Sequence, residues 1–301
     1  MKIEVASSDD VAALYLRYIE LVDSGRELTL EVVFAPGVYG VASIGPIRLD
    51  LGGNPPPKDP KIDVILRGAS ADPPAVLRDL GVLVTARSLR LADLILTGRS
   101  QGLLEARVAR SFAMARCVVA HNVWGGPWGG ALMRVLGVHG RPAYSVEIED
   151  SWFVRNGQES EAALLAIGPA TGSYVEEVAV RRVTFLENTT HGDLVVHEAR
   201  AIRADDVLAV KDHAGGAAVL RYERTQKVEI ERSTFVVDEP AAVAFEDTRA
   251  WRSGMALIGS EIRASGGPRG AALDEIVAEL TRRIPDPAAA RARLREALGL
   301  D

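Results

Sequence analysis

An arginine flanked by acidic side chains is the group in this sequence best suited to chemistry. Glu149, Arg181, Asp205 and Glu231 each close a short apolar-x-apolar stretch at a similar place in successive segments. If these residues lie side by side, two carboxyl groups could act as general acid and base while Arg181 holds an anionic substrate. The alternative interpretation is a row of alternating charges on an exposed strand face, where cross-strand ion pairs are ordinary.

A repeated pattern supplies the strands that would carry these residues. Residues 145–156, 177–188 and 228–238 each read as apolar-x-apolar, a polar kink, an aromatic residue and a polar close, and weaker copies lie at 111–122 and 201–212. A unit that recurs every ~20–50 residues is typical of a solenoid. Such short strands, with no helices between them, must pair with the equivalent strand one coil on. The sequence therefore predicts an all-β solenoid with three short strands per coil.

Polar residues end these repeats in a column formed by Asn122, Asn156, Asn188, Asp212 and Asp238. Side-chain amides in successive tight turns can hydrogen-bond along a stack, so we expect Asn156 and Asn188 to lie in adjacent turns. The aromatic position of the repeat is expected to point into the tube, where it would stack Phe153, Phe185 and Phe235.

This coil pattern and its asparagine column resemble the right-handed parallel β-helix of the pectate-lyase-like superfamily, over roughly residues 28–265. The segment Phe34-Ala35-Pro36-Gly37-Val38-Tyr39 is also similar to the way that family begins its first coil. The resemblance implies a single-stranded right-handed parallel β-helix whose catalytic groove runs along PB1, the first strand of each coil. It does not extend to catalytic motifs: Gly137-Val138-His139-Gly140 has the wrong spacing for the Gly-His-Gly of polygalacturonases, and the Tyr-Gly-x-Asp-Pro-His of alginate epimerases is absent.

Period-2 alternation places the aliphatic residues of PB1 inward and its charged residues outward. Since neighbouring coils are about 4.8 Å apart, the four charged residues named above could touch in series. A slip of one residue in the coil at 200–212 would remove Asp205 from the row.

A second candidate site is the turn at 121–130, with two tryptophans among four glycines and a proline. Exposed aromatic side chains beside polar groups can stack on sugar rings or on partner proteins. The candidate ligand-binding residues are Trp124, Trp128, Trp152, His121 and Arg155, with Trp152 expected to face outward. The alternative is that the indoles fold over the wall of the solenoid and pack on each other.

Amphipathic segments flank the repeats and divide the chain into 1–27, 28–265 and 266–301. Helical spacing predicts one helix at 9–24 and a hairpin of helices at 271–284 and 288–298. An open solenoid end exposes strand edges that invite aggregation. We therefore expect the first helix to cap one end and the hairpin to dock on the last coil, Met255 to Ala264, or on the same element of a second chain.

Composition narrows the functional classes. The chain has 301 residues with 48% hydrophobic content, a net charge of −6 and no run of Lys or Arg, so a nucleic-acid partner is not expected. Its one cysteine, Cys117, excludes an intramolecular disulfide framework. It shows no apolar leader and no apolar run long enough to span a membrane, which predicts a cytoplasmic protein without a membrane partner.

The sequence thus predicts a binding or assembly scaffold that has no cofactor and no metal. Its partner would be a protein, or a second copy bound through the C-terminal helices, with a glycan as a further possibility. The alternative is a carbohydrate-active enzyme, a lyase, hydrolase or epimerase, acting on an acidic glycan through the PB1 groove.

Overall fold

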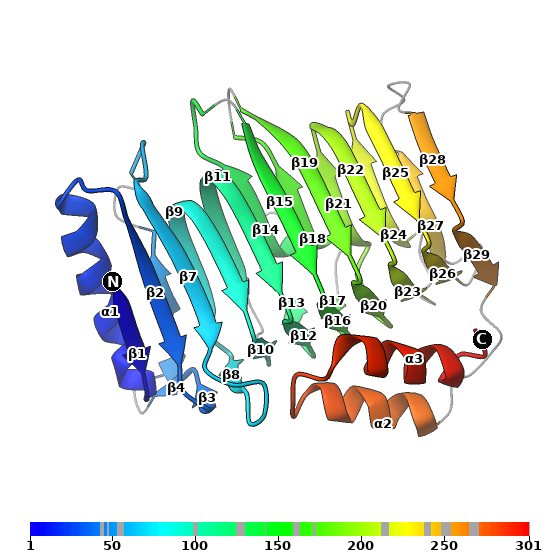
Figure 1. Ribbon diagram of the computed structural model, residues 1–301, viewed down its shortest axis with the longest axis horizontal. Helices are drawn as coiled ribbons and strands as arrows, with labels where there is room; N and C mark the ends of the chain where they lie inside the picture. Colours follow the sequence, from blue (N-terminus) through cyan, green and yellow to red (C-terminus); the bar gives the residue numbers. More distant parts are fainter. Residues whose placement is uncertain are drawn as a thin grey trace.

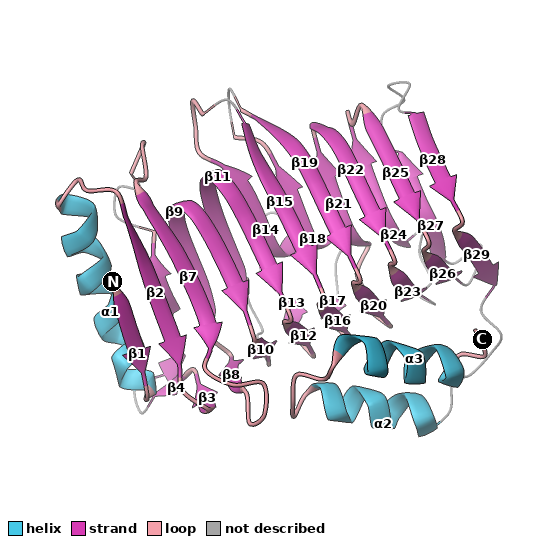
Figure 2. Cartoon of the chain, in the orientation of Figure 1, coloured by secondary structure: helices cyan, strands magenta, loops and turns pink. Residues whose placement is uncertain are grey.

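The computed structural model describes residues 1–42, 45–46, 48–52, 57–98, 102–124, 130–141, 143–158, 163–170, 173–211, 217–237, 242–247, 254–264 and 271–300. Parallel strands stack into an all-β solenoid, with one helix across the first coil and two helices along a flank (Figure 1). Strands make up most of the described residues, and the described helices lie in the two terminal segments of the chain (Figure 2). The predicted all-β architecture with three strands per coil is confirmed.

The PB1 strands form the row that carries the predicted charges. They are β2 (Leu28–Phe34), β7 (Ile62–Gly68), the second halves of β9 (Gly81–Ala92) and β11 (Leu104–Ala115), then β15 (Ala143–Glu149), β19 (Tyr174–Arg181), β22 (Ala199–Asp205), β25 (Lys227–Glu231) and β28 (Gly254–Ile258). A short strand that the sequence analysis missed, β1 (Lys2–Val5), pairs with β2.

PB2 is the second row, reached from PB1 by a tight turn. It comprises β3 (Gly37–Tyr39), β8 (Ala75–Arg78), β10 (Leu94–Thr97), β12 (Val118–Ala120), β16 (Trp152–Val154), β20 (Thr184–Leu186), β23 (Leu208–Lys211), β26 (Thr234–Val237) and β29 (Glu261–Ala264).

PB3 is the third row and leads into the next PB1 strand. It contains β6 (Arg48–Leu51), the first halves of β9 and β11, then β14 (Ala131–Gly137), β18 (Ala163–Gly168), β21 (Gly192–His197), β24 (Ala217–Glu223) and β27 (Ala242–Asp247). Two small pairs lie outside the rows: β4 (Val41–Ala42) with β5 (Gly45–Pro46), and β13 (Val123–Trp124) with β17 (Gly157–Gln158).

Aliphatic and aromatic side chains fill the tube between the three rows. Phe153 and Phe185 stack with ring centroids 5.1 Å apart, and Phe235 packs edge-on against Phe245 at 4.8 Å. Ala209 occupies the coil between Phe185 and Phe235. The predicted inward register of the aromatic position is therefore confirmed.

The asparagine ladder is also present, at the end of PB2. Asn122 donates through Nδ2 to Asn156 Oδ1 at 3.0 Å, and Asn156 donates likewise to Asn188 Oδ1 at 2.9 Å. All three side chains are buried, and each amide also donates to a backbone carbonyl. Asp212 and Asp238, predicted to continue this column, lie outside the described residues.

Helix α1 (Ser8–Asp23) closes the first coil, as its sequence predicts. Ser7 and Asp10 form a reciprocal capping box at its start. Val11, Leu14 and Tyr18 are buried in the main core, and the Tyr18 hydroxyl donates to the Thr85 carbonyl.

The prediction that the C-terminal helices dock on the last coil is wrong. Helices α2 (Ala271–Leu280) and α3 (Pro287–Ala297) form, with Asp286 as the N-cap of α3. They do not dock on the last coil but pack along the outer face of PB2, where Figure 1 shows them beside the PB2 strands. The reason is that the outward PB2 positions are themselves apolar, so this flank offers more surface to bury than the single coil at the end.

Candidate functional site

The four predicted charged residues do occupy one row. Glu149 lies opposite Arg181, Arg181 opposite Asp205, and Asp205 opposite Glu231, on the consecutive strands β15, β19, β22 and β25. The coil around Asp205 is therefore in register, and the slip considered above does not occur.

Their ion pairs, however, run diagonally and out of the row. Arg181 Nη1 lies 2.6 Å from Glu147 Oε1, and the ion pairs among the described residues do not join Arg181 to Glu149 or Asp205. Asp205 pairs instead with Arg232 at 2.5 Å, and Glu149 lies 3.7 Å from Arg182. The predicted arrangement, an arginine clamped between the carboxylates of its own row, is thus replaced by pairing with neighbouring columns.

The outer face of PB1 continues this pattern toward its other edge. Arg203 bridges Glu177 at 3.1 Å and Glu229 at 3.3 Å, and Lys227 contacts Glu229 at 2.6 Å. Hydrogen bonding from Lys227 lowers the pKa of Glu229, which favours its ionised form. Most of the charged side chains of this face thus form ion pairs in contact with solvent.

A second ladder, which the sequence analysis did not identify, lies in the turn between PB1 and PB2. Acidic and basic residues alternate there in successive coils, all with left-handed backbone conformation: Asp93, Arg116, Asp150, Arg182, Asp206 and Arg232. Arg116 forms two 2.7 Å hydrogen bonds to Asp93, and Arg182 binds Asp150 at 2.6 and 2.9 Å. The Arg182 hydrogen bonds lower the pKa of Asp150. The signal was available, because each of these residues is the charged residue at the kink of the repeat.

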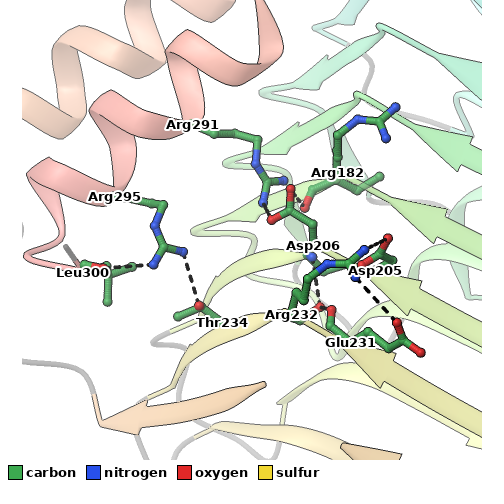
Figure 3. Close-up of polar contacts among 12 residues, drawn as sticks. Arg182, Asp205, Asp206, Glu231, Arg232, Thr234, Arg291, Arg295 and Leu300 are labelled. Atoms are coloured by element: carbon green, nitrogen blue, oxygen red, sulfur yellow. Dashed lines mark hydrogen bonds and ion pairs between the residues drawn. The ribbon is translucent and has the colours of Figure 1, made fainter. Parts of the chain in front are cut away.

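At the end of this turn ladder the pairing changes, because helix α3 supplies the arginine that binds the aspartate. Arg291, almost completely buried, donates to Asp206 at 2.7 Å and to the Val183 carbonyl at 3.2 Å. Arg232 turns instead to Asp205, with Glu231 3.8 Å away (Figure 3). Asp205, one carboxylate of the predicted catalytic row, is therefore held by Arg232, while its neighbour Asp206 anchors α3.

The structure changes the interpretation of two predicted ligand-binding residues. Trp152 does face outward from the tube, but it is only 1% exposed because α2 and α3 cover it. Arg155 binds Glu187 at 2.7 Å and Asp274 of α2 at 2.6 Å. Trp152 is therefore buried beneath the helices, and Arg155 is engaged in ion pairs, one of which holds α2 against PB2.

The rest of the tryptophan turn is described only in part. His121 is exposed, at the left-handed position before the asparagine ladder. Trp124 lies in β13, which pairs with β17, but its side chain and all of Trp128 lie outside the described residues. The stacking surface predicted for this turn therefore stays a prediction.

Within the tube lies a charged pair that the sequence analysis missed. Lys211 Nζ is 2.8 Å from Asp193 Oδ1, and both side chains have no solvent exposure. Thr190 donates to the same carboxylate at 2.8 Å, and Lys211 also donates to the Asn188 carbonyl at 3.3 Å. Burial raises the pKa of Asp193, against the opposing effect of Lys211. Because neither group reaches the surface, the pair belongs to the core.

Other catalytic chemistries find little support among the described residues. Burial raises the pKa of Cys117 to about 12, so its thiol stays protonated near neutral pH. In the described ranges, no group of three His, Cys, Asp or Glu residues is arranged to hold a metal ion. The described pockets lie against the three helices and not on the outer face of PB1.

Comparisons of the chain with protein families, with curated proteins and with solved structures found no match in any of the three. Among the described helices, none has the length and apolar character needed to cross a membrane.

Proposed function

We propose that the chain is a single-stranded, right-handed parallel β-helix of the pectate-lyase-like type. Three features support this: three strands per coil, a tight turn between PB1 and PB2, and a buried asparagine ladder. Crossover connections between parallel strands are right-handed in about 98% of cases, which favours this hand. The fold by itself does not specify an activity.

We further propose that this β-helix is a cytoplasmic binding or assembly scaffold, with a protein or a second copy of the chain as its partner. The observation that carries the proposal is the self-paired character of the PB1 face. Arg181, Arg203 and Lys227 each contact a carboxylate there. These cations are therefore already occupied by carboxylates of the chain itself and not by an acidic substrate.

A second candidate function is a carbohydrate-active enzyme acting on an acidic glycan. One observation favours it: Glu149, Arg181, Asp205 and Glu231 lie in register on consecutive strands, so a glycan laid across PB1 would pass over all four. In this function Arg181 would leave Glu147 and bind a substrate carboxylate.

The two candidates are separated by direct assay on acidic glycans. The wild-type protein is incubated with polygalacturonate and with alginate, and unsaturated products and new reducing ends are measured. The scaffold proposal expects no turnover. Turnover that disappears in an Asp205→Asn, Glu231→Gln double variant would overturn it, provided that Glu176→Gln, which alters an exposed carboxylate outside the row, keeps the activity.

A further inference from the structure

The last coil exposes residues that belong to the core. Met255, Leu257 and Ile262 lie in register with Val228, Ile230 and Phe235, which point into the tube and are buried. In the last coil these positions are 42%, 44% and 46% exposed. Strands β28 and β29 each end their row, with pairing only to the preceding coil among the described residues. The solenoid thus presents an apolar end bordered by unpaired backbone groups, a combination that favours pairing with another chain.

The opposite end limits how copies can associate. Helix α1 covers the first coil, with its own Val11, Leu14 and Tyr18 buried against the core. The core at the first coil is therefore already covered, and it cannot be joined to the core exposed at the last coil, although among the described residues the short edge of β1 stays open there. Association that buries the apolar end must use the same surface on both copies, which defines a closed two-fold contact.

We propose that the last coil binds the last coil of a second copy about a two-fold axis through the Gly259–Ser260 turn. Strands β28 and β29 are joined by this turn. Rotation about the line that bisects their corner places β28 of each copy on β29 of the other and reverses the chain direction. Both exposed edges then pair at once, as antiparallel strands.

The sequence of the corner fits this register. With the axis between Gly259 and Ser260, Leu257 lies opposite Ile262 of the second copy, and Met255 lies opposite Ala264. All four positions face inward by their register with the preceding coil, so the two cores become continuous. A register shifted by one residue would instead set inward side chains against outward ones.

The charges of the corner are also compatible with a second copy. Strand β28, Gly254–Ile258, carries no charged residue, so Glu261 and Arg263 of the second copy would face Ile258 and Ala256. No like charges are brought opposite each other, and the existing 2.9 Å pair between Arg263 and Glu261 is retained. The edge therefore complements itself in direction, polarity and charge. The choice of a second copy as the partner rests on the assembly role proposed above.

The first test is the solution mass of the whole chain by sedimentation or light scattering over a wide range of concentration. We expect twice the 32.2 kDa chain mass for the wild type and a shift to the monomer for Leu257→Arg. The matched control is Leu16→Arg, which charges an exposed leucine on α1 at the other end and should keep the dimer mass. A wild type that stays monomeric, or one that grows beyond a dimer, would overturn the proposal.

A second test separates loss of the dimer contact from unfolding of the last coil by Leu257→Arg. Directly opposed antiparallel residues have Cα atoms about 4.5–5.5 Å apart, within the ~4.4–6.8 Å range of disulfides. The Ala256→Cys, Arg263→Cys double variant should therefore form a covalent dimer on mild oxidation, whereas Ala256→Cys alone should not. A dimer that fails to cross-link would overturn the register. Neither result depends on the glycan assay, so the two proposals fail separately.

Discussion

The outer faces of PB1 and PB2 belong to the same tube and share its core, yet they have opposite characters. On the central PB1 strands the charged outward residues pair with each other and are open to solvent, as with Arg181 and Glu147. On the central PB2 strands most outward residues are apolar, as with Val118, Trp152 and Leu186, and they are buried under α2 and α3.

The difference shows how one solenoid separates its surfaces by residue type alone. Both strands alternate inward and outward in the same way, so the outward residue decides whether a face stays in water or is covered. PB2 recruits its cover from the end of the chain, through apolar contacts and through Arg291. PB1 is left as the open face.

The largest effect on the difference between the two faces is expected when α2 and α3, which cover PB2, are removed. Deletion of residues 270–301 would expose Trp152 and the other apolar residues of PB2 together. Each fully buried large apolar side chain contributes ~1.5–3 kcal/mol, so the combined loss should exceed that of any single substitution. We expect aggregation, measured by light scattering after purification. A truncated protein that stays soluble and folded would mean that PB2 tolerates water as PB1 does.

Trp152→Ala tests whether the covered face behaves as a true core. Removing a buried tryptophan should lower the free energy of unfolding by about 3–5 kcal/mol, the range also expected for Phe185→Ala inside the tube. Both losses can be measured by chemical denaturation. A loss below ~1 kcal/mol for Trp152→Ala alone would show that the helices do not cover it in solution, since a buried core residue should cost more.

The polar anchor of the helices should give a smaller effect. Arg291→Ala removes a nearly buried guanidinium from Asp206 and from the Val183 carbonyl. Hydrogen bonds to charged groups are worth about 1.5–3 kcal/mol, and we expect a loss in that range by urea denaturation. The matched control is Arg293→Ala on the same helix, whose pair with Glu279 is exposed and should contribute at most ~1 kcal/mol. Equal losses for the two variants would contradict the anchoring role.

The smallest effect is expected in the open turn ladder. Arg182→Gln removes the partner of Asp150, and because the arginine is about half exposed the loss at neutral pH should be below ~1 kcal/mol. The folded-state pKa of Asp150 is lowered, so its contribution is present above the unfolded value of about 3.9 and is lost as the pH falls through the folded value. Urea denaturation of both proteins from neutral to acid pH should show the difference shrink. A difference that grows in acid would reverse the assignment.

The repeat made much of the fold predictable. Short strands that recur with the same inward residues can satisfy their backbone only by stacking, so the rows could be predicted from spacing. Spacing alone did not decide the register around Asp205. The asparagine ladder followed for the same reason, since Asn156 and Asn188 close successive coils.

The site was less predictable because its contacts depend on segments distant in sequence. Arg291 lies far along the chain from Asp206, and no local pattern links them. A partial signal did exist at Trp152-Phe153-Val154, where three consecutive apolar residues replace alternation. Continuous apolar strands are typical of sheets buried on both faces. That signal indicates a cover for PB2 and argues against using Trp152 as a ligand platform.

The buried pair of Asp193 and Lys211 has a consequence for how the coils find their places. Gly192 and Leu194 register with Ala163 and Leu165, so Asp193 occupies a place beside Leu164 in an otherwise aliphatic layer. Coils of similar sequence could exchange neighbours at little cost, but a strand displaced by one coil would leave a carboxylate or an ammonium group unpaired in the dry interior. We expect the pair to fix which coils stack on each other, because neighbouring coils are otherwise similar in sequence. Replacing Asp193 by Leu and Lys211 by Met should keep the tube folded but give mixed strand pairings, seen as more than one pattern of hydrogen-exchange protection. A single native pattern of protection would refute this.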